Sequence, residues 1–336
     1  MNILKAILIT VALFLMMPFG VFAEMKLIVA ETHPEDHPTT QGLLKFAALV
    51  KERSNGEIVI EVKFGGVLGK KEAELVEQVQ AGIVDMARFN LFPMTRFAPA
   101  FEALGLPYIW DNQASMWRVL KGETGQKLLK ALEAYRFYGL CYYEAGAQSF
   151  YNAKREIKKV EDLKGLTFRV QRNPVMIELL TMLGANPVPM VFSEVYDAMD
   201  KGVIDGAESN WQAFVAAGHY ELAKYYTLDA HTSIPEILIG SKIALDKKLK
   251  PEQLKLVKQA AQDTQDEVIA RWNAREEAAR KVVRERSQMI MTELTPEARQ
   301  GFVRAVQPLY DKYGEKYKAL IKEIQAAQQY STIRLH

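Results

Sequence analysis

The sequence predicts an α/β protein built from two similar lobes. Strand-like and helix-like segments alternate through most of the 336 residues, which is the pattern of sheets covered by helices. A long helical pattern with charged outer faces covers residues 251–289 and could cross a two-lobed body. Residues 80–87 (QAGIVDMA) also resemble residues 200–207 (DKGVIDGA). In both segments a helix stops at a glycine and an aspartate precedes a strand, so we expect two equivalent corners facing a shared cleft.

The first 23 residues predict a cleaved signal peptide. Lys5 precedes an almost wholly apolar run, residues 6–17, and Val21-Phe22-Ala23 offers small residues for cleavage before Glu24. The alternative is a membrane anchor, but the run is shorter than the roughly 20 residues of a spanning helix. We therefore expect an exported mature protein.

The single cysteine, Cys141, lies in an apolar stretch far from the predicted cleavage site. One thiol forms no internal disulfide, and a lone cysteine in such a stretch is typically buried. No lipid can be attached at the cleavage site either. These features predict a freely diffusing periplasmic protein.

The mature chain begins with alternating elements. We expect strands at residues 26–30, 57–64 and 83–89, and helices between them at residues 39–53 and 72–80. Gly56 and Gly82 follow the two helices and mark their ends.

Two lobes follow from this pattern. We assign residues 24–146 and about 235–275 to lobe I, and residues 147–234 and about 276–330 to lobe II, with part of the long helix and the C-terminal helices. Thr295-Pro296-Glu297 predicts a helix start, because threonine caps the N-terminus and proline fits the first turn.

Composition and motifs argue against several function classes. Lys plus Arg is 43 and Asp plus Glu is 41, a formal charge of +2, whereas nucleic-acid binders usually carry a strong basic excess. The chain contains no nucleophile elbow, phosphate-binding loop or His-Glu-x-x-His motif. Its five histidines form no zinc signature. We expect neither catalysis nor a metal or cofactor.

Arg169 is the strongest candidate for ligand binding. In Leu166-Thr167-Phe168-Arg169-Val170-Gln171 the alternation puts Phe168 and Val170 on one face and Arg169 on the other. A strand with an apolar back holds a planar guanidinium rigidly, which suits two-pronged recognition of a carboxylate. An ordinary surface arginine is the alternative.

His33 and His37 suggest three interpretations: a metal site, hydrogen bonding at a cleft, or ordinary loop polarity. Pro34 and Pro38 force a loop here, whereas metal ligands at this spacing usually sit on a helix. Glu72 lies at the start of a predicted helix, where a carboxylate interacts favourably with the helix dipole whether or not it binds a ligand.

Arg88 and Asn210 each follow one of the two similar corners. That shared position is our reason for placing both beside the cleft. Trp211, next to Asn210, would then cover an apolar face of a ligand.

These residues resemble the solute-binding subunits of tripartite ATP-independent periplasmic (TRAP) transporters, the DctP family. The resemblance covers nearly the whole mature chain, from Glu31-Thr32-His33-Pro34 onward. Its most specific stretches are residues 162–171 (DLKGLTFRVQ), 183–190 (LGANPVPM) and 203–208 (VIDGAE).

The resemblance implies the two-lobed periplasmic binding protein fold, with hinge segments and a long helix that spans both lobes. It also implies that Arg169 binds the carboxylate of the ligand. Ser149-Phe150-Tyr151-Asn152 and the Thr-His-Pro opening are similar to the branch that binds uronates. That branch implies ligand contacts at further residues, namely His33, Glu72, Arg88, Asn210 and Glu236. Asn152, from the resembling stretch, is a further candidate for the site, as is Gln148.

The sequence departs from this branch in three places. Gln148 stands where a second arginine is common, Arg172-Asn173-Pro174 replaces a typical Gln-Ser-Asp, and Ser209 replaces Asn. Losing an arginine removes a charge-assisted contact, and the sequence leaves two alternatives open, that Arg172 replaces this contact or that nothing does. A dicarboxylate, keto acid or aromatic acid therefore remains an alternative ligand.

The resemblance predicts a monomeric periplasmic subunit that captures a small organic acid by lobe closure and delivers it to membrane permease subunits. Its contact with the membrane protein would be transient and peripheral. A periplasmic enzyme acting on a sugar acid, and a sensory module that reports ligand state to a receptor, are the alternatives.

Overall fold

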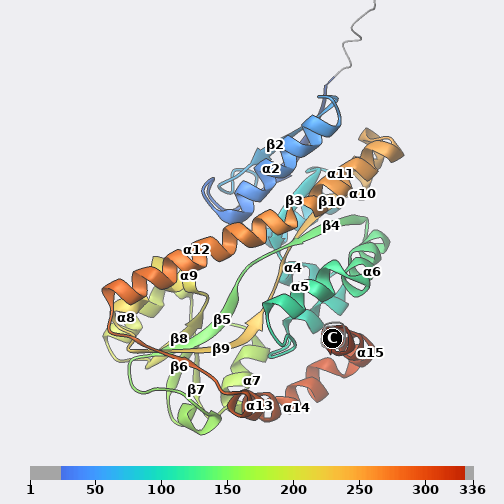
Figure 1. The fold of residues 1–336 in the computed structure, drawn as a ribbon. Coiled ribbons are helices and arrows are strands. Elements are labelled where there is room, and N and C mark those ends of the chain that lie inside the picture. Colours follow the sequence, from blue (N-terminus) through green and yellow to red (C-terminus); the bar gives the residue numbers. More distant parts are fainter. Residues whose placement is uncertain (1–23, 330–336) are drawn as a thin grey trace, which may run out of the picture.

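The computed structural model describes residues 24–329 and confirms the predicted α/β architecture of two lobes, each built around its own sheet (Figure 1). The predicted signal peptide lies outside the described residues. Between residues 24 and 329, no helix combines the length and the apolar character needed to span a bilayer.

Lobe I contains a five-stranded sheet in the order β2-β1-β3-β10-β4. The first three strands are parallel, and β10 runs antiparallel to both of its neighbours. In sheet order the strands are Ile58–Lys63, Met25–Ala30, Met86–Asn90, Glu236–Ser241 and Phe137–Tyr143. The helices of this part of the chain are α2 (Pro38–Arg53), α3 (Glu72–Gln80), α4 (Phe92–Thr95), α5 (Gln113–Lys121), α6 (Glu123–Ala131), α10 (Lys242–Lys248) and α11 (Pro251–Asp263).

Two apolar cores cover the two faces of this sheet. One packs α2 and α11 through Leu43, Phe46 and Val257. The other packs α3, α5 and α6 through residues that include Val76 and Leu128. A helix hydrophobic on one stripe is stable only when that stripe is buried, and here the sheet buries it.

Lobe II contains a six-stranded sheet in the order β11-β9-β5-β8-β6-β7. In that order the strands are Ile290–Glu293, Tyr225–Ser233, Ala147–Asn152, Gly206–Ser209, Thr167–Val170 and Asn186–Pro189. Helices α7 (Pro174–Met182), α8 (Val195–Asp200), α9 (Trp211–Ala216), α13 (Pro296–Ala305) and α14 (Gln307–Leu309) follow the strands or cover them. Two further cores form on this sheet, one around Phe168 and Val170 and the other around Tyr151 and Tyr226.

The predicted long helix spans both lobes but consists of two helices, α11 and α12 (Gln265–Arg286) (Figure 1). The break falls at Thr264, whose hydroxyl donates to the carbonyl of Ala261 and contacts the Tyr143 hydroxyl. Side-chain hydrogen bonds of this kind compete with the helical backbone ladder. The predicted start of α13 is confirmed, since the Thr295 side chain accepts from the Ala298 amide.

The last helix, α15 (Lys318–Gln329), packs in lobe I and not in lobe II, where the sequence placed it. Ile321 and Ile324 belong to the core of lobe I, and Gln328 donates to the Ile109 carbonyl. The chain therefore crosses between the lobes a fourth time after α14. The other crossings are the links β4–β5 and β9–β10 and the helix α12.

The two similar corners of the sequence have the same backbone hydrogen bonds, but they do not face the cleft. The amides of Ile83 and Val203, each following a glycine, bond back to helix carbonyls at 2.9 and 2.8 Å. Strand β3 consequently begins only at Met86, which pairs with Gly240, whereas Asn90 pairs with Glu236 at the cleft. The corners thus lie at the opposite ends of their strands from the cleft, because a strand of four or five residues separates them.

Candidate functional site

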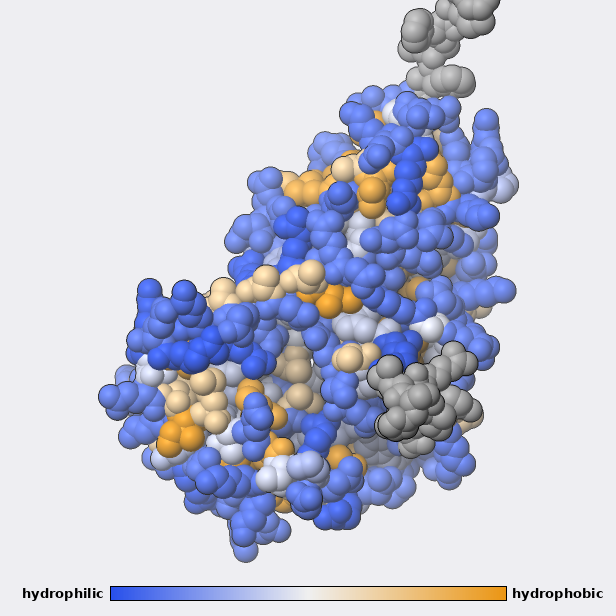
Figure 2. Space-filling model, in the orientation of Figure 1, coloured by the Kyte–Doolittle hydropathy of each residue, from blue (hydrophilic) through white to orange (hydrophobic). Residues whose placement is uncertain are grey.

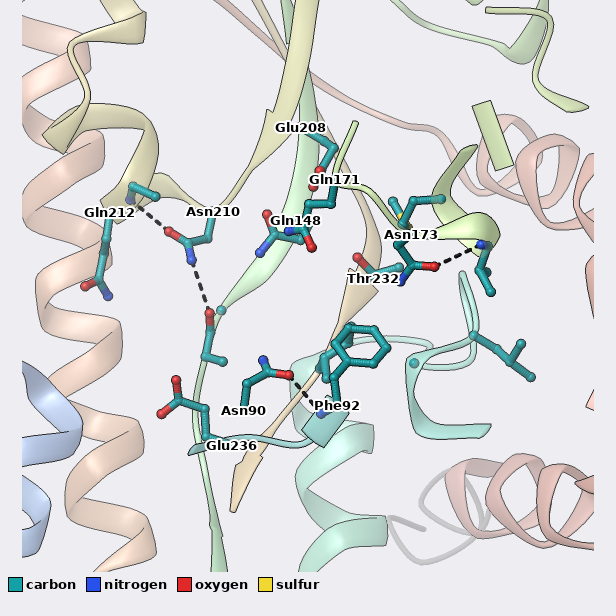
Figure 3. Close-up of a pocket in the computed structure, with 18 of the residues that line it drawn as sticks. Asn90, Phe92, Gln148, Gln171, Asn173, Glu208, Asn210, Gln212, Thr232 and Glu236 are labelled. Carbon is teal, nitrogen blue, oxygen red and sulfur yellow. Dashed lines mark hydrogen bonds between the residues drawn. The ribbon is translucent and has the colours of Figure 1, made fainter. Parts of the chain in front are cut away.

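A cleft of about 700 Å³ lies between the lobes and receives side chains from both sheets and all connecting segments (Figure 3). Lobe I contributes residues at the ends of β3 and in the loop before α2, and lobe II contributes β5, β8 and the starts of α7 and α9. Polar lining residues include His33, His37, Asn90, Gln148, Gln171, Asn173, Glu208, Asn210, Gln212, Thr232 and Glu236. Concave sites of this size with a few convergent polar groups are typical of small-molecule binding.

Arg169 lies in lobe II directly behind this lining. Strand β6 turns Phe168 and Val170 into the core and Arg169 to the other face, as the alternation predicted. Its side chain is 5% exposed and its Nη1 lies 3.5 Å from Glu208 Oε1. Of the five N–H groups of a guanidinium, only Nε makes a hydrogen bond within residues 24–329, at 3.0 Å to the Met190 carbonyl. Its Nη1 and Nη2 therefore have no hydrogen-bond partner among the described residues, although Nη1 lies close to Glu208.

Glu208 stands between Arg169 and the cleft. It lines the cleft, and its Oε1 is buried without a hydrogen-bond partner among the described residues. Burial raises the pKa of Glu208, and the nearby charges of His231 and Arg169 only partly offset this. Buried polar groups are normally hydrogen-bonded, so the unsatisfied Arg169 and Glu208 mark a place where a polar ligand group fits.

The wall of lobe I is a cluster of three carboxylates around one buried arginine. Arg88 is fully buried and forms two hydrogen bonds with Glu31, one of them at 2.7 Å. Its Nη1 lies 3.4 Å from Glu72 Oε1 and 3.0 Å from Glu236 Oε1. Arg88 is therefore saturated by acids and positions them, while the buried Oε2 of Glu236 has no hydrogen-bond partner in the described part of the chain.

The two acids nearest the cleft titrate differently. Burial raises the pKa of Glu72, although Arg88 opposes the shift. Burial also acts to raise the pKa of Glu236, but the charge of Arg88 and the nearby His33 outweigh it and the pKa lies below its usual value. Glu236 thus stays ionised and can accept hydrogen bonds from hydroxyl or ammonium groups of a ligand.

His33 and His37 form a stacked pair at the rim of this wall. Their ring centroids are 3.8 Å apart, and His33 Nε2 lies 3.7 Å from Glu236 Oε1. His37 caps α2 by accepting from the Thr39 amide. Burial, followed by the neighbouring His33, lowers the pKa of His37 to about 3, so this ring is neutral near pH 7.

The crossing segment β4–β5 joins the site to α9 and α12. Asn210 caps α9 through Ala213 and donates to the Ala145 carbonyl at 3.3 Å (Figure 3). Gly146 has φ +73°, and a Cβ there would lie 3.0 Å from Trp272 Nε1 and 3.3 Å from the Asn210 side chain. Only glycine fits this left-handed, crowded position.

Comparison with known proteins identifies the family. The model of the bacterial extracellular solute-binding protein family 7, DctP, matches residues 29–316. The chain belongs to the DctP family. A solute-binding protein of Chromohalobacter salexigens is 32% identical over 299 residues, 88% of each chain. The C4-dicarboxylate-binding periplasmic protein DctP of Rhodobacter capsulatus is 30% identical over 326 residues, 95% of each chain.

Solved DctP-family structures have the same architecture. A TRAP periplasmic solute-binding protein from a Bradyrhizobium species, solved with galacturonate, is 36% identical with a TM-score of 0.75, over 90% of this chain and 99% of that one. The apo, open structure of a Citrobacter koseri protein has a TM-score of 0.82 and is 32% identical, over 90% of this chain and 99% of that one. The structure of a Citrobacter koseri protein with bound D-glucuronate has a TM-score of 0.74 and is 33% identical, over 89% of this chain and 98% of that one. The present structure is thus more similar to the open form of that protein.

Within this DctP-family cleft, four of the nine residues expected at the site form part of the lining: His33, Gln148, Asn210 and Glu236. Arg169, Glu72 and Arg88 lie behind the lining and contact it through Glu208, Asn90 and Glu236. Arg88 is therefore not exposed for direct ligand contact in this conformation, because its donors are taken by acids.

Asn152 and Trp211 do not line the cleft, contrary to the expectation. The Asn152 side chain accepts from the Lys154 and Arg155 amides at the far end of β5. Trp211 stacks on Tyr226 at 3.9 Å in a core of lobe II. Helix geometry explains the second case, since the residue after the cap Asn210 turns away from the cleft.

Sequence reasoning missed several lining residues. Trp272 and Arg275 reach the cleft from α12, and Thr232 and Ile234 reach it from the β9–β10 crossing. Trp272 looked like one more apolar position of an amphipathic helix, and only the tertiary arrangement places it at the site. Asn90 carried a signal, since it shares the face of Arg88 on β3. Within residues 24–329, no grouping of His, Cys, Asp and Glu is suited to hold a metal ion.

Proposed function

We propose that this chain is the periplasmic subunit of a TRAP transporter and that it captures a sugar acid, a hexuronate such as D-galacturonate or D-glucuronate. The observation that carries the proposal is the buried Arg169 beside the cleft, whose Nη1 and Nη2 make no hydrogen bond to residues 24–329 and whose Nη1 lies 3.5 Å from Glu208. A buried cation without full pairing is costly, and a ligand carboxylate would supply the missing acceptors in a two-pronged contact.

The lobe I wall supports a hydroxylated ligand. Glu236 presents an acceptor oxygen to the cleft, whereas the neighbouring Asn90 accepts from the Phe92 amide through Oδ1 and leaves its amide group to donate (Figure 3). Carboxylate acceptors suit hydroxyl donors, and buried donors and acceptors of this kind discriminate strongly against ligands that lack the matching group. One wall thus fits a carboxylate and the facing wall fits the hydroxyls of a sugar ring.

Lobe closure would complete the site. The residues that would hold the carboxylate and those that would hold the hydroxyls belong to different lobes, so both engage a small ligand only when the lobes approach. The hinge of such a closure would include residues 144–146 and the break at Thr264. In the proposed cycle the closed, water-free form is the one that the membrane permease subunits bind, as a monomer and transiently.

Relatives favour this ligand class over others. The Bradyrhizobium and Citrobacter koseri proteins were solved with galacturonate and D-glucuronate, whereas the Rhodobacter capsulatus relative binds C4-dicarboxylates. Gln148 keeps the alternative of another organic acid open to the same test. An enzyme acting on a sugar acid is disfavoured, because family 7 proteins are solute-binding proteins.

Isothermal titration calorimetry of the mature chain with D-galacturonate, D-glucuronate and succinate tests the proposal. We expect at least one hexuronate to bind with a stoichiometry near one, to be recovered unaltered after prolonged incubation, and to raise the melting temperature. Binding of succinate alone, or conversion of the hexuronate to a product, would contradict the proposal.

A further inference from the structure

The cleft has an apolar end that the polar contacts described above do not use. We define it by six residues: Phe92, Leu106, Val175, Met176, Ile234 and Tyr313. Both lobes contribute to it, because Phe92 and Leu106 come from lobe I and Val175 and Met176 from lobe II. A Cβ on Gly105 would lie 3.7 Å from both Phe92 and Ile234, so the side chains of these two residues lie close together beside Gly105.

Polar and apolar groups are separated along the cleft. The buried cleft-lining atoms without hydrogen-bond partners among residues 24–329 are Glu208 Oε1, Gln212 Nε2, Glu236 Oε2 and Trp272 Nε1. None belongs to the apolar end. Figure 3 places Gln212 at one side of the cleft and Asn173, which accepts from the Val175 amide, at the other.

The charged residue beside the apolar end is already paired. The Glu102 carboxylate accepts from the Tyr317 hydroxyl at 3.1 Å and lies 2.8 Å from Lys316 Nζ. The Tyr313 hydroxyl donates to Glu178 at 2.8 Å. The apolar side chains among the six residues offer a ligand hydroxyl no hydrogen bond, so a hydroxyl packed against them would lose hydration, which is unfavourable.

We propose that the apolar end binds an apolar, ring-sized substituent of the sugar acid, so that the preferred ligands are conjugated hexuronates, such as aryl glycosides, and not the free monosaccharide. This inference rests on the proposed function. The cleft volume of about 700 Å³ supports it, since sites of roughly 300–1,000 Å³ enclose drug-sized ligands. Closure would bring the apolar walls of the two lobes onto the substituent and bury its surface.

Calorimetry with methyl β-D-glucuronide and phenyl β-D-glucuronide tests this, because the two differ only in the apolar group. Burying one aromatic ring corresponds to a roughly tenfold to hundredfold gain in affinity. We therefore expect the phenyl glycoside to bind the mature chain at least tenfold more tightly than the methyl glycoside. Equal or weaker binding of the phenyl glycoside would overturn the inference.

Two variants locate the effect. In Phe92→Ser and in Val175→Ser, the affinity ratio of phenyl to methyl glycoside should fall severalfold toward one. Val191→Ser, the same change at an exposed valine outside the cleft lining, should keep the wild-type ratio. An unchanged ratio in both cleft variants, with melting curves showing folded protein, would also refute the inference.

The outcomes separate this inference from the proposed function. If D-glucuronate and D-galacturonate bind but the phenyl group adds nothing, only the apolar end is refuted. If no hexuronate and no glycoside binds, the sugar-acid function itself fails.

Discussion

Replacing Arg88 with methionine should destabilise the protein strongly, because it removes the guanidinium that pairs with Glu31, Glu72 and Glu236. Arg88 and Glu31 are almost completely buried, and Glu236 is 6% exposed. Methionine keeps the length of the side chain and packs in an apolar environment. The change therefore removes charge and hydrogen bonds and leaves the shape of the site close to that of the wild type.

The expected cost follows from the contacts that disappear. Arg88 makes hydrogen bonds to Glu31, Glu72 and Thr32 and an ion pair with Glu236 at 3.0 Å. Removing one partner of a buried pair leaves an uncompensated charge, which costs about 3–5 kcal/mol. The matched control is Arg96→Met, because Arg96 is 71% exposed and pairs with Glu77 at the surface. Exposed pairs contribute roughly 0–1 kcal/mol.

Urea unfolding at pH 8 and pH 5 measures both variants. Without Arg88 the pKa of Glu72 and of Glu236 in the folded state should exceed the unfolded value. The folded variant then binds protons that the unfolded chain does not, so its stability rises as the pH falls. The deficit relative to wild type should shrink at pH 5. A loss below about 1 kcal/mol, or the same loss at both pH values, would refute this reasoning.

Three further predictions concern the cleft and its hinge. Gly146 and Gly165 have φ of +73° and +76°, so Gly146→Ala and Gly165→Ala should each lower the free energy of unfolding in urea by about 1–2 kcal/mol. Only Gly146 is crowded by Trp272, so only Gly146→Ala should also weaken hexuronate binding in calorimetry. Gln148→Arg should tighten D-galacturonate binding about tenfold by adding a charge-assisted contact; unchanged or weaker binding would contradict the site. His37→Asn keeps a capping side chain. Because the pKa of His37 is lowered to about 3, the unfolded histidine binds a proton between pH 6.5 and 5 and the folded one does not. In urea unfolding, wild type should therefore lose about 1.6 kcal/mol over this range relative to the variant.

Local patterns predicted several elements of the fold. The start of α13 at Thr295-Pro296 and the helix at 72–80 followed from capping and apolar spacing, and the structure has both. The break at Thr264 could not be predicted in this way, because it depends on a hydroxyl contact with Tyr143 from a distant strand. The placement of α15 depends likewise on which lobe offers a complementary core, and no local signal carries that information.

The site was predictable where strand alternation orients a side chain. The orientation of Arg169 could be predicted from its strand, whose other face is apolar, and in the structure Arg169 is buried beside the cleft. Asn152 and Trp211 were misplaced, because adjacency to a motif says nothing about which end of a strand or which side of a helix faces the ligand. The saturation of Arg88 by three acids depends on long-range contacts that only the folded chain assembles.

Calorimetry of hexuronate binding to Arg169→Ala and Arg169→Lys tests whether the Arg169 guanidinium holds the ligand. The control is Arg172→Ala, a change at an exposed neighbour. We predict that Arg169→Ala abolishes detectable binding and that Arg169→Lys weakens the affinity at least tenfold, because the planar guanidinium fork is lost. The affinity of Arg172→Ala should stay within about twofold of wild type. Wild-type affinity in a folded Arg169→Ala protein would mean that the guanidinium does not hold the ligand, and would contradict the account.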